Sequence, residues 1–152
     1  MSEHTSSSAT SQPAEDLKRL EKLVGTWALS ADTSGQVTYE WLEGGFFLLQ
    51  RVDMLHAGHR IQGLEVIGHL RPFGEEPSAD IISRFYGSSG ETLDYVYELT
   101  GNTLMIWAGE KGSPAYYKGT FSEDGNVCVG AWEFPGGGGY SSTMTRVRRQ
   151  ED

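Results

Sequence analysis

The sequence predicts an all-β fold, an antiparallel up-and-down barrel of about ten strands preceded by one short helix. Two observations support this prediction. From Gly25 onward, runs of seven to ten residues rich in Val, Ile, Tyr, Phe and Trp alternate with glycine-bearing turn signals. No helical pattern separates these runs, so neighbouring strands are expected to pair antiparallel through tight turns. A β-sandwich remains the main structural alternative.

The N-terminal segment divides into a tail and a helix. Residues 1–12 are almost wholly Ser, Thr, Ala, Glu, His and Gln, a composition that predicts a disordered tail. Residues 13–23 are expected to form an amphipathic helix, with Pro13 in its first turn and an ion pair between Glu15 and Arg19. Its apolar stripe consists of Leu17, Leu20 and Leu23. Residues 13–149 therefore form one domain, with strands over 24–149.

Turn positions predict which side chains point into the barrel. Nine turns are expected, at residues 33–35, 44–45, 57–58, 72–77, 88–90, 101–102, 109–114, 124–125 and 135–139. Because side chains alternate across a strand, the centre of each hairpin fixes which residues share a face. Hairpins centred on 44–45 and 57–58 align Tyr39 with Gln50, and Gln50 with Glu65. A hairpin centred on Ser88 and Ser89 places Arg84 on one face with Tyr95.

The predicted interior is apolar and aromatic with several polar groups. Its candidate ligand-binding residues are Tyr39, Trp41, Gln50, Glu65, His69, Arg84, Tyr86, Tyr95, Tyr97 and Trp132. An unpaired buried polar group costs about 1–3 kcal/mol, so this many polar groups favour a ligand cavity over a packed core. The alternative is that Glu65 and Arg84 simply pair across a water-filled lumen.

Two short patterns resemble a known superfamily. Gly25-Thr26-Trp27 follows the predicted helix, and Thr145-Arg146-Val147-Arg148 lies in the last strand. This combination resembles the lipocalin and fatty-acid-binding superfamily, which implies that Trp27 plugs the closed end of a barrel and that Arg146 packs over its indole. Fatty-acid binders of the superfamily carry Arg-x-Tyr in the last strand, whereas this chain has Arg148 in place of the tyrosine. Haem-binding relatives need a late histidine, but all four histidines lie in the first half of this chain.

A closer likeness is to bacterial lipocalin-like proteins of unassigned function, over roughly residues 23–149. It is carried by Tyr39-Glu40-Trp41-Leu42, Gly44-Gly45-Phe46-Phe47-Leu48, Arg51-Val52-Asp53, Gly63-Leu64-Glu65-Val66-Ile67-Gly68 and Thr145-Arg146-Val147. This likeness implies the fold but no particular activity.

Composition excludes several partners. Twelve basic and twenty-one acidic residues give a net charge of −9, which repels nucleic acids and anionic membranes. The longest apolar run, residues 46–49, is far shorter than the about 20 residues that a membrane helix needs. Cys128 has no partner for a disulfide and the chain opens without a signal peptide, so a cytoplasmic location is expected. His56 and His59 straddle a turn without further donors, and no metal or other cofactor is predicted.

The sequence therefore predicts an intracellular protein that binds a small, largely apolar or aromatic molecule inside a barrel. The alternative from another class is a barrel enzyme, an isomerase or cyclase, that uses Glu65, His69 or a tyrosine for proton transfer. No nucleophile, triad or metal set supports catalysis, so binding is preferred. A third hypothesis is a homodimer formed through outward-facing Phe47 and Leu49.

Overall fold

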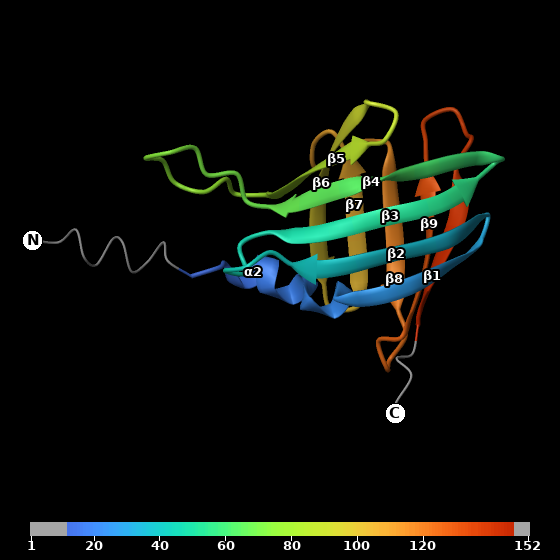
Figure 1. Ribbon diagram of the computed structural model, residues 1–152, viewed down its shortest axis with the longest axis horizontal. Coiled ribbons are helices and arrows are strands. Elements are labelled where there is room, and N and C mark those ends of the chain that lie inside the picture. Colours follow the sequence, from blue (N-terminus) through green and yellow to red (C-terminus); the bar gives the residue numbers. More distant parts are fainter. Residues whose placement is uncertain (1–11, 148–152) are drawn as a thin grey trace, which may run out of the picture.

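The computed structural model describes residues 12–147, which form a closed antiparallel barrel of ten strands (Figure 1). Around the barrel the strands follow the order β1-β10-β9-β8-β7-β6-β5-β4-β3-β2, so each strand pairs with its neighbours in sequence and β10 pairs with β1. The predicted fold class is confirmed, and the sandwich alternative is wrong. All but one residue of the predicted tail lies outside the described part of the chain.

Most elements succeed one another with short connections, and the longest, between β4 and β5, spans residues 69–80. A helical segment consists of α2 (Glu15–Lys18) and the 3₁₀ helix η1 (Arg19–Leu23). The strands are β1 (Gly25–Ala31), β2 (Thr33–Trp41), β3 (Leu48–His56), β4 (His59–Gly68), β5 (Ile81–Gly87), β6 (Thr92–Thr100), β7 (Thr103–Ala108), β8 (Tyr116–Phe121), β9 (Val127–Glu133) and β10 (Tyr140–Arg146).

The helical segment covers one end of the barrel, which we call the closed end (Figure 1). Leu17, Leu20 and Leu23 are 1%, 0% and 0% exposed and belong to the barrel core. The helix begins at Glu15 rather than Pro13, and the α-helical part ends at Lys18. Glu15 therefore pairs with Lys18 at 3.4 Å, not with Arg19 as predicted, since Arg19 already belongs to the tighter 3₁₀ turn.

The opposite end of the barrel carries the loops that follow β1, β3, β5, β7 and β9, and we call it the mouth. Strands β1–β4 cross the front of the barrel and β6–β9 cross behind them at a steep angle (Figure 1). Because the closed end is filled by helical leucines, any space inside the barrel must lie toward the mouth. No helix in the described range is long and apolar enough to cross a membrane.

Strand register agrees with the predicted hairpins in the first half of the barrel but not at β5 and β6. Tyr39 pairs with Gln50, and Gln50 pairs with Glu65, as predicted. Gly87 N, however, donates to Glu91 O, so the β5–β6 loop has three residues instead of the two assumed. Gly90, with φ of 97°, supplies the left-handed conformation that such loops commonly require.

Because of this one-residue difference, the face of β5 that was predicted to point outward lies inside the barrel. Ser83 pairs with Tyr95, and both Ser83 and Phe85 are buried, at 1% and 6% exposure. The predicted inward orientation of Arg84 and Tyr86 is therefore wrong, because a shift by one residue moves each side chain to the other face.

The first and last strands meet at the closed end around a buried tryptophan. Trp27 is fully buried and lies opposite Arg146 in the β1–β10 register. The Arg146 guanidinium carbon lies 4.2 Å from the centre of the Trp27 ring. Trp27 Nε1 donates to Leu23 O at 2.8 Å, which ties the end of the helical segment to this pair.

Candidate functional site

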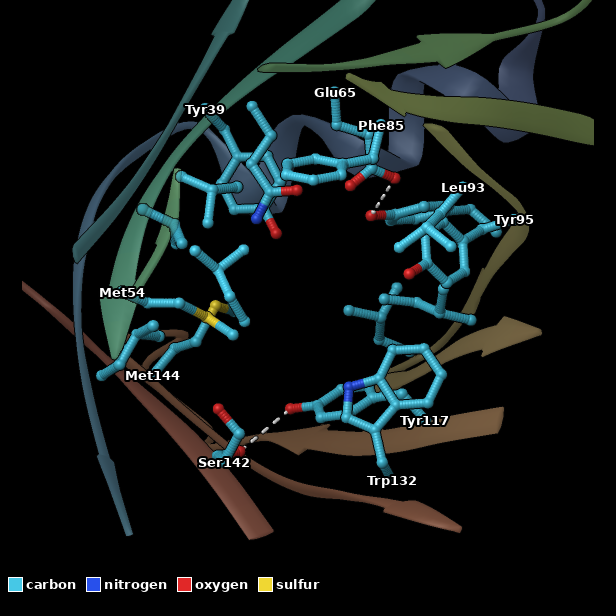
Figure 2. A pocket seen from close by; sticks show the side chains of 18 of the residues that line it. Tyr39, Met54, Glu65, Phe85, Leu93, Tyr95, Tyr117, Trp132, Ser142 and Met144 are labelled. Atoms are coloured by element: carbon cyan, nitrogen blue, oxygen red, sulfur yellow. Dashed lines mark hydrogen bonds between the residues drawn. The ribbon is translucent and has the colours of Figure 1, made fainter. Parts of the chain in front are cut away.

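The barrel encloses a cavity of about 260 Å³ that extends toward the mouth (Figure 2). Its walls are mostly apolar, and its aromatic members are Tyr39, Phe85, Tyr95, Tyr97, Tyr117, Trp132 and Tyr140. The aliphatic and sulfur-bearing members include Leu29, Val52, Met54, Leu104, Ile106 and Met144. Leu93, which is 47% exposed, forms part of the outer edge. The arrangement can enclose a small molecule in largely apolar surroundings.

Of the ten predicted binding residues, six line this cavity. They are Tyr39, Gln50, Glu65, Tyr95, Tyr97 and Trp132. They come from strands far apart in sequence, β2, β3, β4, β6 and β9, and are brought together only by closure of the barrel.

Glu65 is the principal polar feature of one wall. It is 5% exposed, and Tyr97 Oη donates to its Oε2 at 3.0 Å (Figure 2). Burial raises the pKa of Glu65 above its ordinary value, and the hydroxyls of Ser83 and Tyr97 offset part of this effect. Ser83 Oγ is fully buried and makes no well-formed hydrogen bond within the described residues. Gln50, across the β3–β4 ladder, completes the polar part of this wall.

The opposite wall is built around Tyr117. Its hydroxyl donates to the backbone oxygen of Ser142 at 3.3 Å (Figure 2). The same hydroxyl lies 3.9 Å from the Cys128 sulfur. Gly130 makes room for this side chain, because a Cβ there would meet the Tyr117 hydroxyl. Burial raises the pKa of the Cys128 thiol, which keeps it protonated and unsuited to nucleophilic attack.

Aromatic rings continue from this wall to the mouth. Trp132 lies 5.8 Å from both Tyr95 and Tyr117, measured between ring centroids. Phe134 stacks on Trp132 at 5.8 Å, and Tyr140 lies 6.4 Å from Phe134. The cavity thus has a continuous aromatic side that leads from its interior to solvent.

A histidine stacks on this aromatic side at the mouth. The His56 ring lies 3.8 Å from the Tyr140 ring, and it faces His59 across the hairpin. No group of three or more potential metal ligands occurs among residues 12–147. In this part of the chain, the two histidines therefore have no third histidine, cysteine or carboxylate side chain with which to form a metal site.

Two predicted site residues lie at the closed end instead of in the cavity. Trp41 Nε1 donates to Glu21 Oε1 at 2.6 Å. The His69 ring lies between Asp16 Oδ1, at 2.9 Å, and Ser78 O, at 2.8 Å. The helical segment fills this end of the barrel, so the predicted placement of both side chains in the lumen is wrong.

The other two predicted residues lie on the outer surface. Arg84 makes a two-pronged pair with Asp94 at 2.6 and 3.0 Å, and its side chain is 54% exposed. Tyr86 is 48% exposed. The alternative in which Glu65 and Arg84 pair across the lumen is consequently wrong.

Several cavity residues were not chosen from the sequence. Phe85 was missed because the length of its loop was misjudged. Counting back from Arg146 in steps of two along β10 would have found three of them, Tyr140, Ser142 and Met144. Arg146 was predicted to point inward, and every second residue of a strand shares the same face.

Comparisons with known proteins add no family to this description. No protein-family model matches the chain, and a search of curated proteins finds no match. The fold and the cavity together define a β-barrel that is compatible with binding a small molecule.

Proposed function

We propose that this protein binds a small, largely apolar or aromatic molecule inside its barrel, in the manner of lipocalin-like proteins. The observation that carries the proposal is the cavity of about 260 Å³ with aromatic walls and a few buried polar groups. Ligand pockets typically measure about 300–1,000 Å³, so the ligand is a small one.

Packing argues against a purely structural interior. Protein cores contain few voids larger than a water molecule, whose share of liquid volume is about 30 Å³. The cavity is several times larger, and the side chain of Glu65 faces it without a basic partner on the wall. A ligand would restore the contacts that these walls lack.

Three further features support the proposed family likeness, compartment and choice of partners. The stacking of Arg146 on Trp27 supports the likeness to the lipocalin superfamily. The buried free thiol of Cys128 suits a reducing, cytoplasmic compartment. A net charge of −9 disfavours nucleic acid and anionic membranes as partners. A homodimer through Phe47 and Leu49 stays a prediction.

A proton-transfer enzyme is the second candidate, favoured by one observation. Glu65 combines a raised pKa with a hydrogen-bonded tyrosine at a cavity wall, which is the environment of many general acids and bases. Only Glu65 and the tyrosines would serve in this role, since His69 lies outside the cavity. Unchanged turnover of a candidate substrate by Glu65→Gln would exclude Glu65 from this role.

The binding proposal is tested with a neutral fluorescent lipophile, N-phenyl-1-naphthylamine, titrated into the full chain. Ser142→Phe places a ring in the cavity, and Ser141→Phe places the same ring on the exposed face of the same strand. We expect saturable binding that Ser142→Phe weakens at least about tenfold, equivalent to about 1.4 kcal/mol, and that Ser141→Phe preserves. Thermal melts verify that both variants are folded.

Equal binding to both variants would place the probe outside the barrel and contradict the proposal. Val52→Phe, which fills the cavity from β3, repeats the test if Ser142→Phe unfolds the chain. Absence of binding by the unsubstituted protein, to this probe and to a panel of other small lipophiles, would equally contradict it.

A further inference from the structure

The described residues that line the cavity include an acidic side chain but no basic one. Among the described residues that line it, Glu65 is the single carboxylate, and there is no lysine, arginine or histidine. An anionic ligand would meet no counter-charge in a low-dielectric space and would lie near a buried acid. The fatty-acid carboxylate, which needs a basic partner, is therefore a poor match for this lumen.

No second charged group modifies Glu65 from the strands around it. The polar side chains around it on β2, β3, β5 and β6 are Tyr39, Gln50, Ser83, Tyr95 and Tyr97. Burial raises the pKa of Tyr39 and Tyr97 well above the ordinary tyrosine value, so both hydroxyls stay neutral. Glu65 is thus an isolated acid among neutral groups.

The hydrogen-bonding capacity of Glu65 is not exhausted by Tyr97. An ionised carboxylate offers about four acceptor sites, and the Tyr97 hydroxyl occupies one of them. A donor that also carries positive charge would both complete these contacts and remove the cost of a lone buried charge.

The rest of the wall also favours a cation. Tyr95 lines the cavity near the Glu65–Tyr97 pair, and Trp132 lies 5.8 Å from Tyr95 at a tilt of 52°, toward the wall built around Tyr117. The faces of such rings attract cations, most strongly when the cation is desolvated. The apolar side formed by Met54 and Met144 lies across the hollow from these rings (Figure 2).

We infer that the barrel selects a small lipophilic amine, whose ammonium group binds Glu65 while its apolar body packs among Trp132, Met54 and Met144. This inference rests on the proposed binding function and names the chemical class of its ligand. The protein's net charge of −9 attracts cations to the protein as a whole and so acts in the same direction.

The test uses three probes of nearly equal shape, measured by isothermal titration calorimetry on the full chain near neutral pH. They are 2-phenylethylammonium, 2-phenylethanol and 3-phenylpropanoate. A charged hydrogen bond in place of a neutral one predicts that the ammonium compound binds roughly tenfold or more tighter than the alcohol. No binding is expected for the carboxylate.

Matched variants assign this preference to one residue. Glu65→Gln keeps the shape of the side chain and should weaken ammonium binding about tenfold or more, while the affinity for the alcohol changes by less than about threefold. Glu133→Gln removes the same charge from an exposed position on β9 and should leave the preference unchanged. If Glu65→Gln does not fold, Tyr97→Phe, which removes the hydroxyl that orients the carboxylate, should reduce the preference instead.

The outcomes separate this inference from the proposed function. Binding of the alcohol or the carboxylate as tight as that of the ammonium compound overturns the inference. So does a preference that survives Glu65→Gln, or displacement of N-phenyl-1-naphthylamine by none of the three probes. Each of these results leaves the cavity as a binding site, whereas failure of the fluorescent lipophile test contradicts the proposed function itself.

Discussion

Replacing Arg146 with methionine should lower the free energy of unfolding by about 3–4 kcal/mol. The guanidinium donates to Val24 O at 2.6 Å, to Lys22 O at 3.0 Å and to Asn126 Oδ1 at 3.1 Å. Hydrogen bonds from a charged group contribute about 1.5–3 kcal/mol each and are not additive. The contact with the Trp27 ring contributes about 0.5–1 kcal/mol more. The expected loss of stability is smaller than the sum of these contributions, because they are not additive and because methionine retains part of the packing over the Trp27 indole.

Urea unfolding, followed by circular dichroism and tryptophan fluorescence, measures this change. Arg84→Met is the matched control, because Arg84 also makes a two-pronged contact, with Asp94, but on the exposed surface. Exposed pairs of this kind contribute about 0.2–1 kcal/mol. The reasoning is refuted if the two variants lose similar stability, or if Arg146→Met loses less than about 1 kcal/mol.

Three further predictions concern the interior. Burial raises the pKa of Glu65 in the folded state, so ionisation of Glu65 opposes folding. The unsubstituted protein should therefore lose stability as pH rises from about 4.5 through the folded-state pKa, and Glu65→Gln should not. The stability of Glu65→Gln relative to the unsubstituted protein should thus increase over this range. Urea titrations at pH 4.5 and pH 7.5 check this, and a difference that does not grow with pH contradicts it. Gly130→Ala should lower the melting temperature by its clash with Tyr117, and the additional change Tyr117→Leu should recover part of the loss; a double variant less stable than the single one argues against the clash. Leu20→Ala, at a fully buried position, should cost about 2–5 kcal/mol by urea unfolding, and a cost below about 1 kcal/mol would show that the helical segment is not part of the core.

The sequence predicted the architecture because its local signals agree with one another. Turn residues recur at strand spacing, and the leucine stripe before Gly25 has helical spacing. At Ala57 and Gly58 both φ angles are positive, 52° and 79°, as a two-residue hairpin turn requires. That turn could be read correctly from its residues, and the register of β3 and β4 followed from it.

The site was harder to predict because it depends on two quantities that a sequence shows poorly. One is whether a loop contains an even or odd number of residues, which decided the orientation of Arg84, Tyr86 and Phe85. The other is depth along the barrel axis. Strand alternation predicts that Trp41 and His69 point inward, but only the packed helical segment shows that its own side chains, Glu21 and Asp16, contact them at that end of the barrel.

Closure of the barrel through β1 and β10 also constrains how the chain acquires its structure. Arg146 contacts Val24, 122 positions earlier, and the last strand supplies the second neighbour of the first. Until residue 146 has been synthesised, β1 and β9 are left with unpaired edges that can add strands from other chains. Contacts of such long sequence separation slow folding, so the incomplete barrel is the state in which aggregation through these edges is expected.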